Sequence, residues 1–428
     1  MDTVVACSTP FGSSALSVVR VSGPKTKSFI LSLQKKPKKI KHNSPFLASF
    51  FDEDGAVFDE GIINVFLGPS SYTGEDLAEI SCHGNPIIVD RLISLACAFG
   101  CRLAEPGEFT KRAYLNDKVD ISQAEAVASL ISSRSLDGTK LTYKNLGGEL
   151  SAKVSSIKKE IISVVGELEF NLDISEEDLQ PNLFKRCSQK ILLLKDGLDL
   201  ALKGYKKTNL LNLGANVVIA GPTNAGKSTL FNLLLEEERA IISKTPGTTR
   251  DVLQDTINIE GMPIVLKDTA GIRKTKNKIE KAGINKTEKE MAAADLVLFF
   301  GKKQKIENNY IYIFNKADIK TPPSSGYDIK ISALKGKNIK KLKKLIIKRL
   351  SKEVAASSLV LTSKRQAENI FLSKKSLEKA LEGLFLETSL ELVVEDLNSS
   401  IVSLDKITEK TTKEDILSSI FSSFCVGK

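Results

Sequence analysis

One eight-residue segment, Gly221-Pro-Thr-Asn-Ala-Gly-Lys-Ser228, limits the fold of this chain more than any other feature of its sequence. It lies directly after the strand-like run 216–220 and directly before the helix-like run 229–235. A Gly-x4-Gly-Lys-Ser pattern in this setting is typical of a phosphate-binding loop, because glycines let backbone N–H groups surround phosphate oxygens and the helix N-terminus adds positive potential. We therefore expect a mostly parallel α/β nucleotide-binding domain around this segment.

Three later motifs follow in the order of a GTPase. In Asp268-Thr-Ala-Gly271, the Asp268 side chain would hold Mg²⁺ through the coordination shell of the ion, and the Gly271 N–H would sense the γ phosphate. Asn315-Lys-Ala-Asp318 would bind the base, because the Asp318 carboxylate can accept two hydrogen bonds from guanine, whereas adenine would leave it unpaired at a cost of about 1–3 kcal/mol. Ser332-Ala-Leu334 can offer a backbone contact to the guanine O6. Together the motifs predict a GTP site, with Lys227 on the β and γ phosphates and Ser228 and Thr249 on Mg²⁺.

The residue after Asp268-Thr-Ala-Gly271 is Ile272, at the position where a Ras-like enzyme carries its water-positioning glutamine. An isoleucine cannot orient a water molecule. Another group must therefore position the water and offset the developing negative charge.

Composition narrows the possible chemistry. Two histidines and six cysteines occur in 428 residues, without a Cys-x-x-Cys pair, so a zinc site and a disulfide scaffold are both disfavoured. No apolar run approaches the roughly 18 residues of a membrane span, and the N-terminus has no signal-peptide pattern. We therefore expect a cytoplasmic protein with no membrane partner.

The formal net charge is +10, and the segment Lys330–Lys352 alone carries ten basic residues and no acidic one. Apolar residues recur within it at helical spacing. This pattern favours an amphipathic helix with a solvated basic face, and contact with nucleic-acid phosphates is the second interpretation.

The hydrophobic pattern changes along the chain and predicts a multidomain protein. Short β-branched runs up to about residue 118 indicate an α+β domain, and helical periodicity dominates from 119 and again after 364. Strand-like and helical patterns alternate between those helical stretches. We expect an N-terminal domain over 1–118, a discontinuous all-α domain over 119–210 and 355–428, and an inserted α/β P-loop GTPase domain over 211–354, with hinges at Lys203–Lys207 and Ser351–Ser363.

Further motifs flank the GTPase set on both sides. They are Ser71-Tyr-Thr-Gly-Glu-Asp76, Cys82-His-Gly84, Pro106-Gly-Glu-Phe109, Tyr114-Leu-Asn-Asp-Lys118, Gln123-Ala-Glu-Ala126 and Phe424-Cys-Val-Gly-Lys428. With these motifs the chain resembles the MnmE (TrmE) family of tRNA modification GTPases over essentially its full length. The resemblance implies a homodimer joined through an N-terminal domain that binds formyl-tetrahydrofolate. It also implies K⁺-dependent pairing of GTPase domains and a heterotetramer with the flavoprotein MnmG that modifies carbon 5 of the wobble uridine of certain tRNAs.

The resemblance also assigns residues. It makes Glu280 the group that orients water, places Arg250 and Arg273 at the switches, and makes Cys425 necessary for tRNA modification. The K⁺ ligands it implies are Asn224, Ser243, Thr245 and Thr248, and the folate ligands are Arg20, Glu79, Lys118 and Lys428. The full set expected around GTP is Asn224, Ala225, Gly226, Lys227, Ser228, Thr229, Ser243, Lys244, Thr245, Pro246, Gly247, Thr248, Thr249, Asp268, Thr269, Ala270, Gly271, Asn315, Lys316, Ala317, Asp318, Ser332, Ala333 and Leu334.

Two other functions stay open at this point. One is a ribosome-assembly or signalling GTPase that binds RNA without modifying it, although the region 364–428 shows helical stripes and a cysteine tail rather than an RNA-binding module. The other is a folate carrier with an inactive GTPase domain, which the intact nucleotide motifs disfavour.

Overall fold

The computed structural model describes residues 2–35, 39–172, 182–238, 254–268, 288–303, 309–319, 325–350, 359–386, 389–408, 414–422 and 424–428. The chain forms two compact units. One consists of Met1–Ala128 with Asp405–Lys428, and the other of Ser129–Leu404.

The first unit contains a six-stranded sheet in the order β3-β4-β5-β2-β1-β6. β1 and β6 are parallel, and the other neighbouring pairs are antiparallel. Buried and less buried side chains alternate along β4, as expected for a strand with one face on a core, and α1 and α2 cover that core. The strands are β1 (Val4–Cys7), β2 (Leu16–Ser22), β3 (Phe46–Phe51), β4 (Val57–Phe66), β5 (Leu77–His83) and β6 (Arg102–Leu103).

The helices of this unit include α1 (Thr26–Ser32), α2 (Pro86–Ala98), α3 (Glu108–Leu115) and α13 (Glu414–Phe421), and α4 (Ile121–Ser132) begins in it. α2 starts where the Asn85 side chain accepts a hydrogen bond from the Ile87 N–H at 2.9 Å and Pro86 takes the first helical position. α13 buries Leu417 and Phe421 against Tyr114. The α+β character predicted for the N-terminal domain is confirmed.

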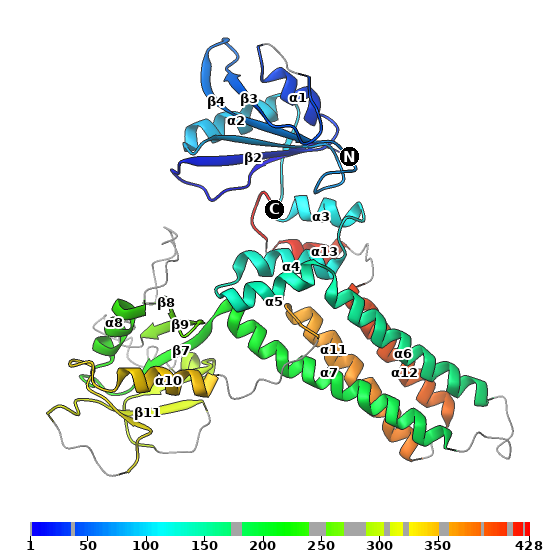
Figure 1. Ribbon diagram of the computed structural model, residues 1–428, viewed down its shortest axis with the longest axis vertical. Coiled ribbons are helices and arrows are strands. Elements are labelled where there is room, and N and C mark those ends of the chain that lie inside the picture. Colours follow the sequence, from blue (N-terminus) through cyan, green and yellow to red (C-terminus); the bar gives the residue numbers. More distant parts are fainter. Residues whose placement is uncertain are drawn as a thin grey trace, which may run out of the picture. The chain divides into compact units, whose positions relative to one another are not determined.

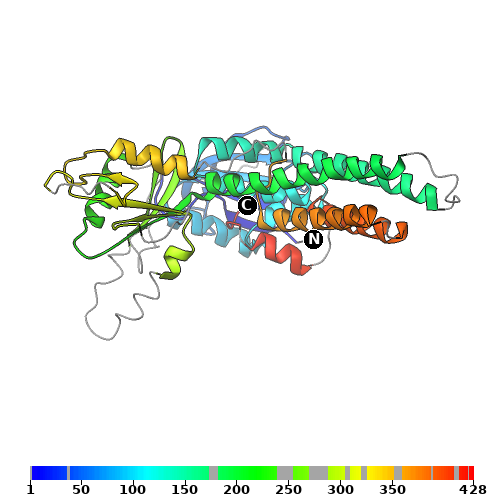
Figure 2. The same cartoon turned by 90° about the horizontal axis from the view of Figure 1, so that it is seen from below.

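Long helices form much of the second unit: α5 (Leu136–Leu146), α6 (Glu149–Leu172), α7 (Leu183–Leu213), α11 (Lys364–Phe385) and α12 (Leu390–Thr408), whose last residues enter the first unit. Figures 1 and 2 both show α7 and α11 side by side. α11 begins with a capping box, in which Ser363 and Gln366 exchange side-chain and backbone hydrogen bonds. Within the described ranges, no helix is both long and apolar enough to cross a membrane.

The second unit also contains a six-stranded sheet in the order β12-β11-β10-β7-β9-β8. All its neighbouring strands are parallel except β8, which runs antiparallel to β9. This confirms the predicted α/β architecture, and the strand-like run at 216–220 corresponds to β7. The elements are β7 (Ala215–Ala220), α8 (Lys227–Glu238), β8 (Gln254–Ile259), β9 (Met262–Asp268), β10 (Leu296–Phe299), β11 (Tyr310–Phe314), β12 (Ile329–Lys330) and α10 (Ile339–Leu350).

One predicted hinge is wrong. Lys203–Lys207 lies inside α7, which continues without a break to Leu213 and passes into β7 through Gly214. Leu210 and Leu211 are buried in the core under the second sheet, so burial of the last turn of α7 outweighs the low helix propensity of Gly204. Of the other predicted hinge, Ser351–Ser363, residues 351–358 lie outside the described residues.

The basic segment is only partly helical. Lys330 ends β12, and the helix begins at Ile339, after Asn338 adopts a φ of 63° and donates from its side chain to the Lys330 carbonyl oxygen at 2.8 Å. Lys343 is buried and forms an ion pair with Glu237 at 2.6 Å, so one lysine of the face predicted to be solvated is in fact part of the packing.

Candidate nucleotide site and C-terminal tail site

The phosphate loop joins the end of β7 to the start of α8, as the sequence predicts. Gly226 has a φ of 95°, and a Cβ atom there would lie 2.2 Å from the Asn315 Nδ2 atom. Only glycine fits so close an approach in this backbone conformation. The loop backbone is therefore fixed against the segment predicted to bind the base.

Lys227 is buried at the start of α8, with 7% of its surface exposed. Its Nζ atom donates to the carbonyl oxygens of Gly221 at 3.1 Å and Pro222 at 2.8 Å. The ammonium group thus lies over the loop, within the ring of backbone groups that the sequence assigns to phosphate. Ser228 and Thr229 follow it in the exposed first turn of α8.

Asn315 connects three of the predicted motifs. Its Nδ2 atom donates to the Ala225 carbonyl oxygen at 2.9 Å, and its Oδ1 atom accepts from the Ala333 N–H at 3.0 Å. The Ala317 N–H donates to the Ile331 carbonyl oxygen at 3.0 Å. The phosphate loop, the Asn315–Asp318 segment and the Ser332–Leu334 segment therefore form one bonded assembly at the carboxyl ends of β7, β11 and β12, the usual ligand edge of such a sheet.

Asp318 is the exposed acid of this assembly. A side-chain hydrogen bond with Ser332, its own backbone N–H and the nearby charges of Lys335 and Lys337 hold the pKa of the Asp318 carboxyl below its usual 3.8. The group is therefore an ionised hydrogen-bond acceptor at neutral pH. Of the predicted neighbours, Lys316 and Leu334 are exposed beside it.

The switch half of the predicted GTP site is not in the described part of the chain. Asp268 ends β9, but its side chain is not described. The predicted residues outside the described ranges are Ser243, Lys244, Thr245, Pro246, Gly247, Thr248, Thr249, Arg250, Thr269, Ala270, Gly271, Arg273 and Glu280.

In the first unit, the C-terminal tail Cys425–Lys428 is bonded to the start of α3 and to the sheet. The Gly107 N–H donates to the Cys425 carbonyl oxygen at 3.3 Å, and the Phe109 N–H donates to the Lys428 main-chain oxygen at 3.2 Å. Pro106 and Val426 form an antiparallel bridge between these bonds. The tail thus pairs along the Pro106–Phe109 motif, while the Cys425 side chain remains exposed.

Gly427 is the most tightly held residue of this tail. Its carbonyl oxygen accepts from the Ser8 hydroxyl at 2.9 Å and from the Arg20 Nη1 atom at 3.3 Å. Its φ is 88°, and a Cβ atom there would lie 2.4 Å from the Cys7 carbonyl oxygen. Any other residue would have to push the tail away from β1.

Three of the four predicted folate residues lie together beside this tail. Arg20 and Glu79 form an ion pair across β2 and β5, with Nη2 and Nε at 2.7 Å and 2.9 Å from one Glu79 oxygen. Burial and the Arg20 charge lower the pKa of the Lys428 ammonium group. The fourth, Lys118, donates from Nζ to the Pro69 carbonyl oxygen at 3.0 Å.

Sequence reasoning missed two residues of this region. Burial raises the pKa of Tyr72, whose hydroxyl is 2.9 Å from the Thr110 hydroxyl and within the field of Arg20. Arg112 is 6% exposed and binds two acids of the quoted motifs, Glu75 at 3.1 Å and Glu108 at 2.9 Å. The four-residue spacing of Glu108 and Arg112 could have indicated their ion pair, whereas no local pattern indicated the contact of Arg112 with Glu75.

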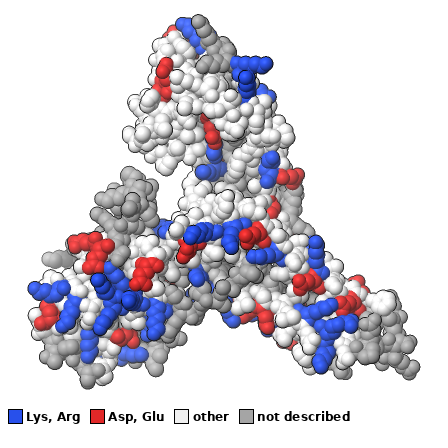
Figure 3. Space-filling model, in the orientation of Figure 1, with Lys and Arg blue, Asp and Glu red and all other residues white. Residues whose placement is uncertain are grey.

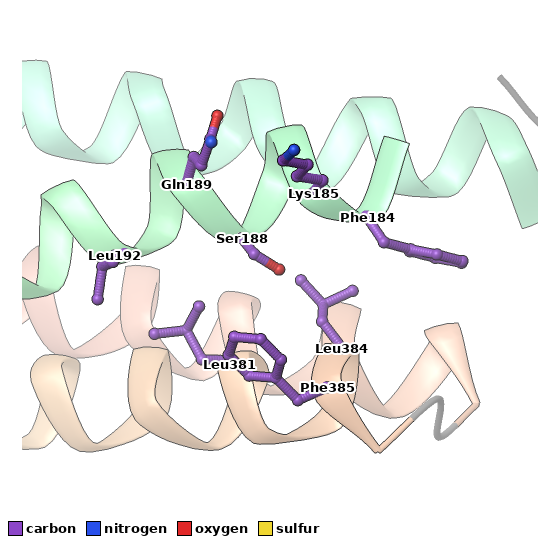
Figure 4. Close-up of a pocket in the computed structure, with 8 residues that line it drawn as sticks. All are labelled: Phe184, Lys185, Ser188, Gln189, Leu192, Leu381, Leu384 and Phe385. Carbon is purple, nitrogen blue, oxygen red and sulfur yellow. The ribbon is translucent and has the colours of Figure 1, made fainter. Parts of the chain in front are cut away.

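A separate apolar pocket of about 320 Å³ lies between α7 and α11 in the second unit. Figure 4 shows aromatic and leucine side chains from both helices around it, with the Ser188 hydroxyl directed between them. None of the predicted site residues lines this pocket, so it is not part of either site. Its lining residues are Phe184, Lys185, Ser188, Gln189, Leu192, Leu381, Leu384 and Phe385.

Comparison with known proteins gives matches over the whole chain. The family model described as the GTP-binding protein TrmE N-terminus matches residues 3–118, and the model described as the MnmE helical domain matches residues 121–425. The chain is 36% identical over 447 residues to the tRNA modification GTPase MnmE of Aquifex aeolicus and 37% identical over 454 residues to that of Thermotoga maritima. Both alignments cover 100% of this chain and 100% of the relative.

Among solved structures, the G domain of the T. maritima FeoB iron transporter matches 32% of this chain and 98% of its own, with 20% identity and a TM-score of 0.23. At that TM-score the match supports no conclusion.

Proposed function

The chain belongs to the MnmE family of tRNA modification GTPases, and we propose that it is a potassium-activated GTP hydrolase acting with the flavoprotein MnmG on carbon 5 of the wobble uridine of certain tRNAs. Membership of this family shows that the protein is a GTP-hydrolysing, tRNA-modifying enzyme. We further propose that the enzyme and MnmG add an aminomethyl-type group to the uridine, with formyl-tetrahydrofolate as the one-carbon donor.

Guanine selectivity is assigned to Asp318. Its carboxylate stays ionised because Ser332 and two lysines stabilise the charge. It would accept hydrogen bonds from the guanine N1–H and 2-amino groups, and an adenine base would leave the acceptor unpaired. The bonds from Asn315 to Ala225 and Ala333 support this role, since they hold the base-binding segment and the phosphate loop at a fixed separation.

Phosphate binding is assigned to the loop and to Lys227. The Lys227 ammonium group donates to two loop carbonyl oxygens, and it would exchange these neutral acceptors for phosphate oxygens, because hydrogen bonds between two charged groups are stronger. The close approach at Gly226, which a Cβ atom would block, supports a loop shaped to bring backbone N–H groups near phosphate.

Hydroxyl and amide oxygens are ligands of the kind that hard cations take. We assign Mg²⁺ to Ser228 and Thr249, and K⁺ to Asn224, Ser243, Thr245 and Thr248. Asn224 lies exposed in the phosphate loop with a φ of 58°, beside the backbone that would contact phosphate. When bound, these ions offset the charge that develops on the phosphate oxygens. Glu280 would orient the attacking water, a role that Ile272 cannot fill, and Arg250 and Arg273 would act at the switches.

The tail site is assigned to the one-carbon donor. Lys118, Arg20 and Lys428 supply cations for the carboxylates of the folate tail, and Glu79 supplies an acceptor for the pterin amino group. The Arg20–Glu79 ion pair and the Arg20 bond to Gly427 support this assignment, because they place both charge types next to the tail that carries Cys425. We infer that Cys425 takes part in tRNA modification.

The proposal also covers assembly. A homodimer would form through the N-terminal domain, and it would bind MnmG as a heterotetramer. We infer an N-terminal domain over 1–118, a helical domain over 119–210 and 355–428, and an inserted GTPase domain over 211–354.

The observation that carries the proposal is the bonded assembly that Asn315 forms between the phosphate loop and the base-binding segments, in a chain that matches the family over its full length. The test is the rate of GTP hydrolysis in KCl and in NaCl at equal ionic strength. We expect faster hydrolysis in KCl, and we expect Glu280→Ala to remove most turnover while nucleotide binding is retained. Equal rates in the two salts would refute the potassium assignment.

A further inference from the structure

The exposed face of α10 carries four lysines that pair with no acidic residue of the described ranges. Lys340, Lys341, Lys344 and Lys348 are exposed, while the other side of the helix is buried under the sheet of the second unit. Figure 3 shows a cluster of basic side chains on the part of the molecule where Figure 1 draws α10. The nucleotide site described above uses none of these four lysines.

Other helices of the same unit contain ion pairs between residues four apart. Glu149 pairs with Lys153 in α6, Asp199 with Lys203 in α7, and Lys364 with Glu368 in α11, each four residues apart. Such pairs support a helix, whereas like charges at the same spacing weaken it. These three helices therefore combine surface lysines with acidic residues at helical spacing.

The helix α10 departs from that pattern. Lys340 and Lys344 are four residues apart, and so are Lys344 and Lys348, so each pair places like charges together. The first turn contains no acid and carries Lys340 and Lys341 where the helix dipole disfavours cations. The arrangement opposes helix stability, so folding alone does not explain it.

Two described acids beside α10 pair with other residues of the helix. Glu237 pairs with the buried Lys343 at 2.6 Å, and Asp328 pairs with Arg349 at 3.6 Å. Across the part of the chain that the structure describes, Lys340, Lys341, Lys344 and Lys348 have no acidic group within 4.0 Å. Their four charges face solvent along a stretch of roughly 12 Å of helix, at 1.5 Å per residue.

We propose that these four lysines, the α10 lysine face, bind the phosphate backbone of tRNA; this rests on the proposed function. Lysine acts as a point charge and suits phosphate contact rather than base reading. A membrane surface is disfavoured because the apolar residues of α10 are packed into the core and cannot insert among lipids. An acidic protein is the remaining alternative, and the test separates it from RNA.

The test is the salt dependence of the binding of bulk tRNA to the full chain. The variant replaces Lys340, Lys341 and Lys344 with Gln. Its control replaces Lys364, Lys375 and Lys379 of α11 with Gln, because these three are also exposed and the change in net charge is the same. Each lost phosphate contact lowers the slope of log affinity against log salt by about 0.7–0.9. We expect the α10 variant to lose about two units of slope and at least about tenfold in affinity at physiological salt.

GTP hydrolysis by the α10 variant should stay unchanged, which shows that the domain is folded. The inference is overturned if the variant and the control bind tRNA with the same slope. It is also overturned if poly-glutamate, added in excess, displaces tRNA from the wild type to the same extent as polyphosphate of equal total charge. If the wild type binds no tRNA at any salt concentration, the proposed function fails together with this inference. If the wild type binds tRNA but the α10 variant behaves like the control, only this inference fails.

Discussion

The nucleotide site and the tail site are built in opposite ways. The nucleotide site consists of short motifs that each follow a strand, and Asn315 bonds to the loop and to the Ser332–Leu334 segment once the parallel strands are side by side. The tail site has no such local frame. Its central bond joins Ser8 to Gly427, two residues 419 positions apart. The first site is therefore encoded locally, and the second exists only when both ends of the chain meet.

This difference predicts how each site responds to mutation. A change in the nucleotide site should alter ligand recognition and leave the surrounding fold in place, since β7, β11 and β12 do not depend on the altered side chain. A change in the tail site should release the tail as a unit, because a few hydrogen bonds and one glycine hold it.

The largest expected effect is at Asp318. Asp318→Asn replaces the carboxylate acceptor that we propose for guanine by an amide that can donate to a xanthine oxygen. Losing two hydrogen bonds to a charged group should weaken GTP binding by at least about 100-fold and improve xanthosine triphosphate binding. Nucleotide titration measures both. Formyl-tetrahydrofolate binding in the same variant is the control and should not change; a parallel loss would mean that the two sites are not separate.

Gly427→Ala should have the next largest effect, in the other site. The added Cβ atom would lie 2.4 Å from the Cys7 carbonyl oxygen in a backbone conformation that disfavours alanine, a strain of about 1–3 kcal/mol. Hydrogen exchange at the Gly107 and Phe109 amides, which donate to the tail, should accelerate by about tenfold or more. Val426→Ala is the matched control, because that side chain is half exposed and its bridge to Pro106 is made by the backbone. Equal exchange in both variants would contradict the account.

Ser8→Ala should weaken the same tail less. It removes one of the two hydrogen bonds to the Gly427 carbonyl oxygen and leaves that from Arg20, a change of about 0.5–1.5 kcal/mol. Exchange at the Phe109 amide reports it. Ser14→Ala serves for comparison, since that exposed hydroxyl bonds only within its own loop, to the Leu16 carbonyl oxygen. An effect of Ser8→Ala as large as that of Gly427→Ala would make Ser8, rather than Gly427, the main determinant of tail docking.

The smallest expected effect is the acid response of the first unit. Hydrogen bonds from Arg102 lower the pKa of Asp2 from 3.8 to about 2. Partial burial opposes this shift, and the hydrogen bond from Arg112 adds to it. A lowered folded-state pKa adds stability above pH 3.8, and this stability is lost as the pH falls towards 2. Asp2 is half exposed, so the contribution is at most about 1 kcal/mol. Unfolding midpoints of the wild type and Asp2→Asn should differ at pH 5 and converge at pH 2; a gap that persists at pH 2 would contradict this.

Local patterns predicted the α/β sheet, the phosphate loop and the base-binding motifs, because each is a short strand-loop unit with its own residue requirements. They could not predict Arg112 as the partner of Glu75, since that pairing depends on the packing of α3 against a distant segment, whereas the Arg112 pair with Glu108 is a contact four residues apart within α3. The hinge expected at Lys203–Lys207 failed for the same reason. Burial of Leu210 and Leu211 in the core of the second sheet decides the course of α7, and no local pattern reports it.

The central claim is that the two sites are structurally independent and that tRNA modification needs both. The direct measurement is mass spectrometry of wobble uridines in bulk tRNA from a strain lacking this protein, complemented with the wild type, Asp318→Asn, Gly427→Ala or Val426→Ala. We predict restored modification with the wild type and Val426→Ala, and little or none with Asp318→Asn or Gly427→Ala, although Gly427→Ala still hydrolyses GTP. Full modification with Gly427→Ala would contradict the account.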